Sequence, residues 1–179
     1  MKTFSPVLLA CTLVVPTFAQ DANTNAVPEL ASGTNKVAQV AIAIPASAGV
    51  VSAPLVLTNG IISQPEQTEL PEGGRATYDF AITNAGSYVI RAMVNAPAED
   101  SNSFYVNVDA QPEDPAMIWD IDPTTEFEER TVSWRGNGTP ESDEFVPKRF
   151  NLSAGAHKLF IVGREPAQLK NISIRPAAD

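Results

Sequence analysis

The sequence predicts an all-β protein, an antiparallel β-sandwich or jelly roll, and three observations lead to that prediction. From residue 37 onward, short runs of β-branched and aromatic residues are separated by Gly, Pro and Asn at intervals typical of such folds. Several runs alternate apolar and polar residues with a period of two, which places every second side chain on a buried face. The pattern indicates no helix of ordinary length.

The expected strands follow one another along the chain. The run 76–82 alternates, and its inward set is Tyr78, Phe80 and Ile82. The run 87–94 is apolar on both faces apart from Arg91, which favours a central strand. The run 102–109 alternates most clearly, with Phe104, Val106 and Val108 inward and Ser103, Tyr105, Asn107 and Asp109 outward. Later strands are expected at 130–134, 145–152, 157–162 and 169–175, with turn signals at Asn137-Gly138 and Ala154-Gly155.

The 179 residues suit one domain with flanking segments. Residues 1–19 have a basic start, a short apolar run and small residues before the end, the pattern of a signal peptide for secretion to the periplasm or outside the cell. Residues 20–36 are rich in Ala, Asn, Thr and Ser and are expected to form a disordered tether. The β-sandwich is then expected over 37–176, with a tail at 177–179.

Charge and composition exclude several function classes. Lys and Arg number 12 against 21 Asp and Glu, a formal net charge of −9 that disfavours nucleic acid as a partner. The leader's apolar run is too short to span a membrane. A single His and a single Cys argue against thiolate zinc sites, disulfide frameworks and His-paired nucleophiles. What remains is surface binding and oxygen chemistry.

One segment interrupts the strand rhythm and is the leading candidate for a binding loop. Residues 111–129 carry three prolines and many acidic residues, together with Trp119 and other apolar residues. Long loops on a rigid scaffold often carry binding groups. Aromatic rings offer a ligand a flat apolar surface, while amide and guanidinium groups hydrogen-bond its polar groups. The candidate ligand-binding residues are therefore Trp119, Trp134, Tyr105, Asn102, Asn137 and Arg135.

Each candidate also has a structural interpretation. Either tryptophan could pack in the core or cover a sheet edge, and an Asn more often caps a turn. His157 shares strand parity with Leu159 and is interpreted as a structural histidine. The adjacent Arg164 and Glu165 are interpreted mainly as a structural ion pair, with ligand orientation as the alternative.

Several short patterns, in order, resemble carbohydrate-binding modules of the family 6 and family 35 type. They are Ala85-Gly86-Ser87-Tyr88, Asn102-Ser103-Phe104-Tyr105-Val106-Asn107-Val108-Asp109, Leu152 to Gly155 with His157, Arg164-Glu165, and Leu169 to Ile174. Together they span most of the predicted domain. The resemblance implies a galactose-binding-domain-like β-sandwich, no catalysis, and sugar bound by aromatic and polar loop residues.

The sequence departs from these modules where they hold a structural calcium. The family's closing strand has an Asp where this chain has Lys170, and the carboxylates of the opening strand are absent around Pro45. Calcium prefers six to eight oxygen ligands, so no cofactor is expected, although the acidic cluster of 109–122 keeps calcium as an alternative. We expect the Lys170 ammonium to take the place of the cation and pair with an acidic or carbonyl oxygen.

The expected function is non-catalytic binding of a polysaccharide or glycan, with sugar stacking on loop aromatics. The main alternative is a structural or adhesive domain of the same fold that makes a protein–protein contact. A small hydrolase or lyase built on two of the loop carboxylates is a further alternative. The sequence specifies neither the sugar nor the oligomeric state.

Overall fold

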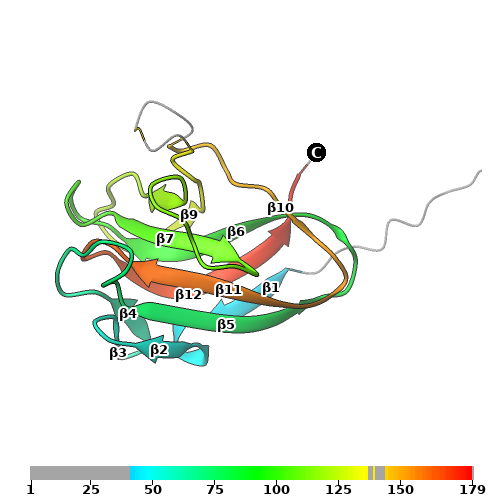
Figure 1. Ribbon diagram of the computed structural model, residues 1–179, viewed down its shortest axis with the longest axis horizontal. Coiled ribbons are helices and arrows are strands. Elements are labelled where there is room, and N and C mark those ends of the chain that lie inside the picture. The colour runs from blue at the N-terminus through cyan, green and yellow to red at the C-terminus, as the bar shows by residue number, and fades with distance from the viewer. Residues whose placement is uncertain (1–40, 137–138, 140–143, 179) are drawn as a thin grey trace, which may run out of the picture. The chain divides into compact units, whose positions relative to one another are not determined.

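The computed structural model describes residues 41–136, 139 and 144–178, and the strands there form two antiparallel sheets (Figure 1). This confirms the predicted all-β class, and the one helical segment in these ranges is a 3-10 turn, Ala46–Ala48. No helix in this part of the chain is long and apolar enough to cross a bilayer. The predicted leader at 1–19, the tether at 20–36 and the candidate residue Asn137 lie outside the described residues.

The larger sheet, sheet A, is built around two long neighbouring strands, β6 and β12. Its path runs β10-β6-β12-β4-β3, with β1 also pairing with β12 and β9 also pairing with β6. Its strands are β1 (Ile42–Pro45), β3 (Val56–Thr58), β4 (Ile61–Ser63), β6 (Gly86–Asn95), β9 (Glu128–Thr131), β10 (Phe150–Leu152) and β12 (Gln168–Pro176).

The smaller sheet, sheet B, has the order β2-β5-β11-β7-β8. Figure 1 shows β5, β11 and β7 as one layer in front of β6 and β12. Its strands are β2 (Val50–Ser52), β5 (Arg75–Ile82), β7 (Ser103–Val108), β8 (Ile118–Asp120) and β11 (Gly155–Gly163).

The core lies between the sheets and follows the period-two pattern of the long strands. Burial alternates along β5, and the predicted inward set is buried as expected: Tyr78, Phe80 and Ile82. In β12 the register shifts between Leu169 and Asn171, so Leu169 and Ile172 both face the core although strict alternation would separate them.

Strand β7 differs from its prediction, because both of its faces are buried. All of its residues are buried, including Tyr105, which was expected to face outward. Tyr105 packs with Val162 of β11, Ile118 of β8 and the partly buried Leu70 in a second apolar cluster. The segment that includes Leu70 is tied down by the hydrogen bond from Thr68 N to Arg164 O, at 2.8 Å. A strand covered on both faces loses the solvent-facing side that alternation implies.

Candidate functional site

Trp119, in β8, is a core residue. Its exposed fraction is 1%, and its ring tilts against Phe104 with the centroids 6.2 Å apart. This follows from strand pairing, because β8 pairs with β7 and places Trp119 opposite Phe104. The expectation that Trp119 presents an indole to a ligand is therefore wrong.

Tyr105 is also inaccessible, with an exposed fraction of 0%. Burial raises the pKa of Tyr105 to about 12. Its hydroxyl oxygen has no hydrogen-bond partner within the described ranges. The expectation of a ligand contact at this ring is wrong for the same reason as at Trp119.

Trp134 is half-buried and contacts both β7 and β10. Its Nε1 donates a hydrogen bond to the carbonyl of Val106 at 2.8 Å. Its ring makes an edge-to-face contact with Phe150, at a centroid distance of 5.7 Å. The Lys148 ammonium lies 3.8 Å from the centroid of the indole ring and covers a face of it. A sugar could stack on that face only after displacing Lys148.

Arg135 binds Asp120 in a bidentate ion pair. The Nε–Oδ2 and Nη2–Oδ1 distances are 2.6 and 2.5 Å. The Asp120 side chain is 3% exposed and that of Arg135 is 15% exposed. The hydrogen bond to Asp120 raises the pKa of Arg135 further above its usual value. The pair fixes the end of β8 against the segment that follows Trp134.

Asn102, just before β7, belongs to the same end of the sandwich. Its backbone nitrogen donates to Glu165 Oε2 at 3.2 Å, and its side-chain amide donates to Glu99 Oε2 at 3.4 Å. Arg164 in turn binds Glu165 and donates to Ser103 Oγ. The Arg164–Glu165 pair is therefore structural, as interpreted, because it joins the β11–β12 turn to the start of β7.

These groups surround a cavity of about 450 Å³ at one end of the sandwich. This is the end of the sandwich at which Gln168 of β12 pairs with Asn95 of β6, and Gly163 of β11 pairs with Phe104 of β7. We call this cavity the loop-end site. Its lining includes Asn102, Asp120, Asp122, Arg135, Phe145 and Glu165.

The exposed ring of the loop-end site is Phe145, which sequence reasoning did not single out. Its exposed fraction is 58%. Phe145 lines both the loop-end site and an adjoining cavity of about 510 Å³. Asp120 and Asp122 also line both cavities. The sequence pattern predicts a strand over 145–152 that would include Phe145, but β10 begins only at Phe150. The polar run before Phe145, rich in Gly, Pro and acidic residues, is the signal that could have indicated a loop.

Acidic side chains dominate the loop-end site. Its lining includes the acidic residues Glu99, Asp120, Asp122, Glu144 and Glu165 and two arginines, Arg135 and Arg164. Each arginine is bound to one of these carboxylates. The site therefore offers carboxylate acceptors for hydroxyl groups and an unfavourable field for anions.

Among the described residues, Lys170 makes a different contact from the predicted one. Its Nζ lies 4.3 Å from the centroid of the Phe127 ring, a cation–π contact rather than the expected pairing with an oxygen. Over 41–136, 139 and 144–178, no group of three or more His, Cys, Asp and Glu side chains could hold a metal ion.

His157 is a structural residue, as interpreted. It is 8% exposed and stacks on Phe80 with a centroid distance of 5.5 Å. Its Nδ1 lies 2.6 Å from Asp109 Oδ2, and its Nε2 lies 2.8 Å from the carbonyl of Ser153. Burial opposes a charge on the ring, but the hydrogen bonds to Ser153 and Asp109 outweigh it and raise the pKa of His157.

No protein-family model matches the sequence, and no curated protein is detectably similar to it. Solved structures do match. A family 35 carbohydrate-binding module from Clostridium thermocellum has a TM-score of 0.54 at 11% identity, over 77% of this chain and 99% of that module. The C-terminal family 6 module of a marine laminarinase from Zobellia galactanivorans has a TM-score of 0.52 at 17% identity, over 76% of this chain and 99% of that module.

Part of an enzyme matches as well. A β-(1,4)-mannanase from Podospora anserina that carries a family 35 module has a TM-score of 0.51 at 12% identity, over 78% of this chain but only 28% of the enzyme chain. The resemblance inferred from the sequence is thus confirmed as a likeness of structure. The chain has the β-sandwich fold of the carbohydrate-binding modules of families 6 and 35.

Proposed function

We propose that this protein binds a neutral carbohydrate without catalysis, at the loop-end site, with Phe145 as the stacking ring. The observation that carries the proposal is an exposed aromatic side chain at the junction of two cavities whose shared lining is otherwise acidic. A pyranose needs this combination, an apolar surface for its C–H face and acceptors for its hydroxyls.

The polar groups around Phe145 suit hydroxyl recognition. Asp122 is exposed and provides carboxylate acceptors. Asp120 and Arg135 hold each other in place, so any hydrogen bond that they make to a ligand starts from a fixed geometry. The acidic surroundings favour uncharged sugars over anionic ones.

Binding without catalysis is supported by the ion pairs that the two buried carboxylates of the site make with arginines. Asp120 is paired with Arg135, and Glu165 is paired with Arg164. A glycosidase of the usual kind needs one carboxyl group that releases its proton to the leaving group. Carboxylates paired in this way favour an orienting role instead.

We also propose that the protein is exported. The leader pattern of 1–19 supports secretion, and the composition of 20–36 supports a tether to the sandwich. An exported module of this kind would meet extracellular or periplasmic glycans directly.

A protein–protein contact remains the second candidate function, and one observation favours it. Apolar side chains are exposed on the short strands β2 and β3: Val50 at 75%, Val56 at 44% and Leu57 at 41%. These strands end the paths of the two sheets, where unpaired backbone groups can accept a partner. This surface does not include the loop-end site.

Affinity electrophoresis against a panel of neutral polysaccharides, followed by calorimetry on any that retards the protein, tests the proposal. Phe145→Ala should weaken binding about tenfold, because an aromatic contact of about 1–1.5 kcal/mol is lost. Val146→Ala is the matched control, since Val146 is adjacent and 59% exposed but lines neither cavity. Absence of binding to every neutral glycan, or equal affinity of Phe145→Ala and the parent protein, would contradict the proposal.

A further inference from the structure

One lateral side of the sandwich exposes apolar side chains at the edges of both sheets. Strand β2 ends the path of sheet B, strand β3 ends the path of sheet A, and the two short strands lie side by side (Figure 1). Val50 of β2 and Val56 and Leu57 of β3 are all exposed there. We call residues 50–58 the β2–β3 edge.

The apolar interior of the sandwich reaches the surface at the β2–β3 edge. Val51 is only partly buried, although it packs against the core. Leu57 pairs with Ile62, and cross-strand partners point to the same face of a sheet. Ile62 is fully buried whereas Leu57 is exposed, because no strand of the described part of the chain pairs with β3 on its other side.

The connection between the two strands is firmly packed. Leu55, which lies between β2 and β3, is buried. A methyl carbon added to Gly74 would lie 1.9 Å from the backbone nitrogen of Leu55, so the two backbones approach closely. The nitrogen of Gly74 also donates a hydrogen bond to Gln64 Oε1, at 2.8 Å. The edge therefore has a fixed shape, and a partner that binds it does not have to order it first.

The β2–β3 edge carries no charge. Residues 37–65 contain no Asp, Glu, Lys, Arg or His. Exposed sheet edges are usually protected from pairing with another chain by charged side chains, by proline or by a bulge. Neither β2, with the sequence VVS, nor β3, with the sequence VLT, contains a charged residue or a proline. The edge thus lacks the usual protection against strand pairing.

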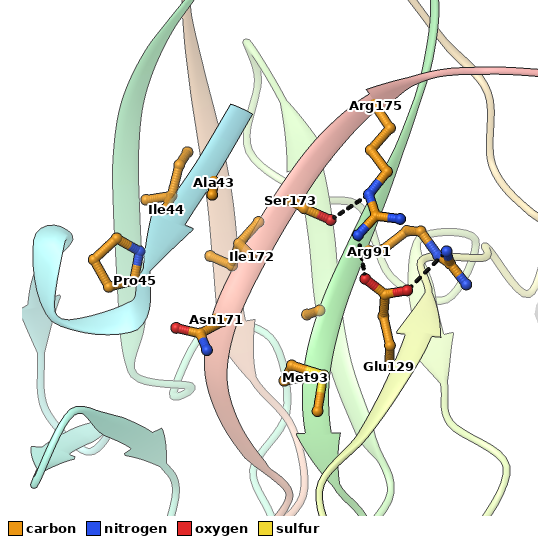
Figure 2. A pocket seen from close by; sticks show the side chains of 11 residues that line it. Ala43, Ile44, Pro45, Arg91, Met93, Glu129, Asn171, Ile172, Ser173 and Arg175 are labelled. Carbon is orange, nitrogen blue, oxygen red and sulfur yellow. Dashed lines mark hydrogen bonds and ion pairs between the residues drawn. The ribbon is translucent and has the colours of Figure 1, made fainter. Parts of the chain in front are cut away.

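Other surfaces of the sandwich do carry charges. On the outer face of sheet A, Glu129 forms ion pairs with Arg91 and Arg175, as Figure 2 shows. On the outer face of sheet B, Lys158 pairs with Asp79. The loop-end site is acidic. The β2–β3 edge differs from all three surfaces in being both uncharged and apolar.

This distribution of charge favours a second copy of the chain as the partner at the edge. Two chains that each carry a net charge of −9 repel one another, so a contact between them is least opposed where neither surface is charged. A two-fold axis brings the same patch of both chains together, and an uncharged patch then opposes no like charges. A basic partner would instead be attracted to the acidic loop-end site.

We propose that the β2–β3 edge is the interface of a symmetric dimer of this chain. Strand β2 lies antiparallel beside β2 of the second copy, and β3 beside β3, so that both sheets continue across the two-fold axis. The inference rests on the second candidate function, a protein–protein contact at this edge, and names the partner. Because each strand has only three residues, the interface is small and the dimer is reversible and dependent on concentration.

The dimer would also affect glycan binding. No residue of the β2–β3 edge lines the loop-end site, so dimerisation leaves that site open in both copies. Two sites in one assembly bind a long polysaccharide more tightly than one site does, because the second contact is made within the same complex. A short oligosaccharide, which reaches one site only, gains nothing from the dimer.

Sedimentation equilibrium of the full chain without glycan, over a series of protein concentrations, tests the proposal. The parent protein should shift from the mass of one chain to that of two as its concentration rises. Val50→Glu and Leu57→Glu should each raise the dissociation constant of the dimer about tenfold or more, because each brings two like charges into one interface. Both side chains are exposed, so both variants should keep the parent circular dichroism spectrum.

The matched control is Val146→Glu, the same substitution at a position that is 59% exposed and lies outside the edge. It should dimerise like the parent protein. A chain that stays monomeric up to about 1 mM would overturn the proposal and leave the edge to a different partner. An equal effect of Val146→Glu, or a mass that grows beyond two chains, would overturn it in favour of non-specific association.

Glycan binding separates this inference from the neutral-sugar proposal. Val50→Glu should keep the parent affinity for a short neutral oligosaccharide and lose part of the retention on a long polysaccharide. Phe145→Ala should lose affinity for the oligosaccharide and keep the dimer. The failure of either proposal is therefore visible without the other.

Discussion

Replacement of Trp119 by alanine should destabilise the sandwich rather than act on a ligand. The indole is 1% exposed and packs against Phe104 in the core cluster that both sheets share. Substitution of a fully buried Trp by Ala costs about 3–5 kcal/mol, from lost burial and from the cavity left behind. In a domain of this size each kcal/mol lowers Tm by about 3 °C, so Trp119→Ala should melt about 9–15 °C below the parent protein.

Thermal unfolding followed by circular dichroism and calorimetry measures this effect. Phe145→Ala is the comparison, because a side chain exposed to 58% should change stability by no more than about 0.5 kcal/mol when truncated. The two aromatic variants should therefore separate, with Trp119→Ala unstable and Phe145→Ala close to the parent Tm. A Trp119→Ala protein that melts with the parent and has lost glycan binding would refute the placement of this ring in the core.

Further outcomes follow from other residues. The raised pKa of His157 means that its contribution to folding stability is complete below pH 6.5 and is lost as pH rises through the higher folded-state pKa. Burial opposes the charge of Asp109, but its hydrogen bonds outweigh burial and lower its pKa, so stability should be lost as pH falls below 3.8. Urea denaturation at a series of pH values should show the highest stability between those limits, and a flat profile would contradict the His157–Asp109 pairing. Asp120→Ala should cost about 3–5 kcal/mol in the same assay, because it leaves Arg135 with a largely buried, unpaired charge, and a loss under 1 kcal/mol would argue against the ion pair. Gly74→Ala should abolish or strongly reduce folding, measured as soluble yield and Tm, since the new methyl carbon would lie 1.9 Å from a backbone nitrogen.

The long strands could be predicted from the sequence because their patterns are local. Strand β5 has a buried face and an exposed face, so its alternation in sequence reports its alternation in burial directly. Strand β7 has the same alternation but lies between β11 and β8 under a covering segment, and this depends on residues far away in the chain. Tyr105 was therefore assigned to the wrong environment.

The positions of the candidate residues in the fold could be predicted only in part, for the same physical reason. Asn102 and Arg135 line the loop-end site. Both are planar polar groups beside strand ends, so the sequence alone could place them in that region. Which aromatic ring is exposed depends on pairing and loop packing. Trp119 is buried because β8 pairs with β7, and Phe145 is exposed because the chain reaches β10 only five residues later. The polar run before Phe145 could have indicated a loop there, but no local pattern indicates that Trp119 is buried.

A titration of the isotope-labelled protein with a retained neutral oligosaccharide, followed by amide NMR shifts, tests the central claim most directly. The account predicts that the largest shifts fall on residues around Asn102, Asp122, Phe145 and Glu165, which surround one cavity although they are distant in sequence. Largest shifts on β2 and β3 around Val50 and Leu57, with the cavity residues unmoved, would contradict it.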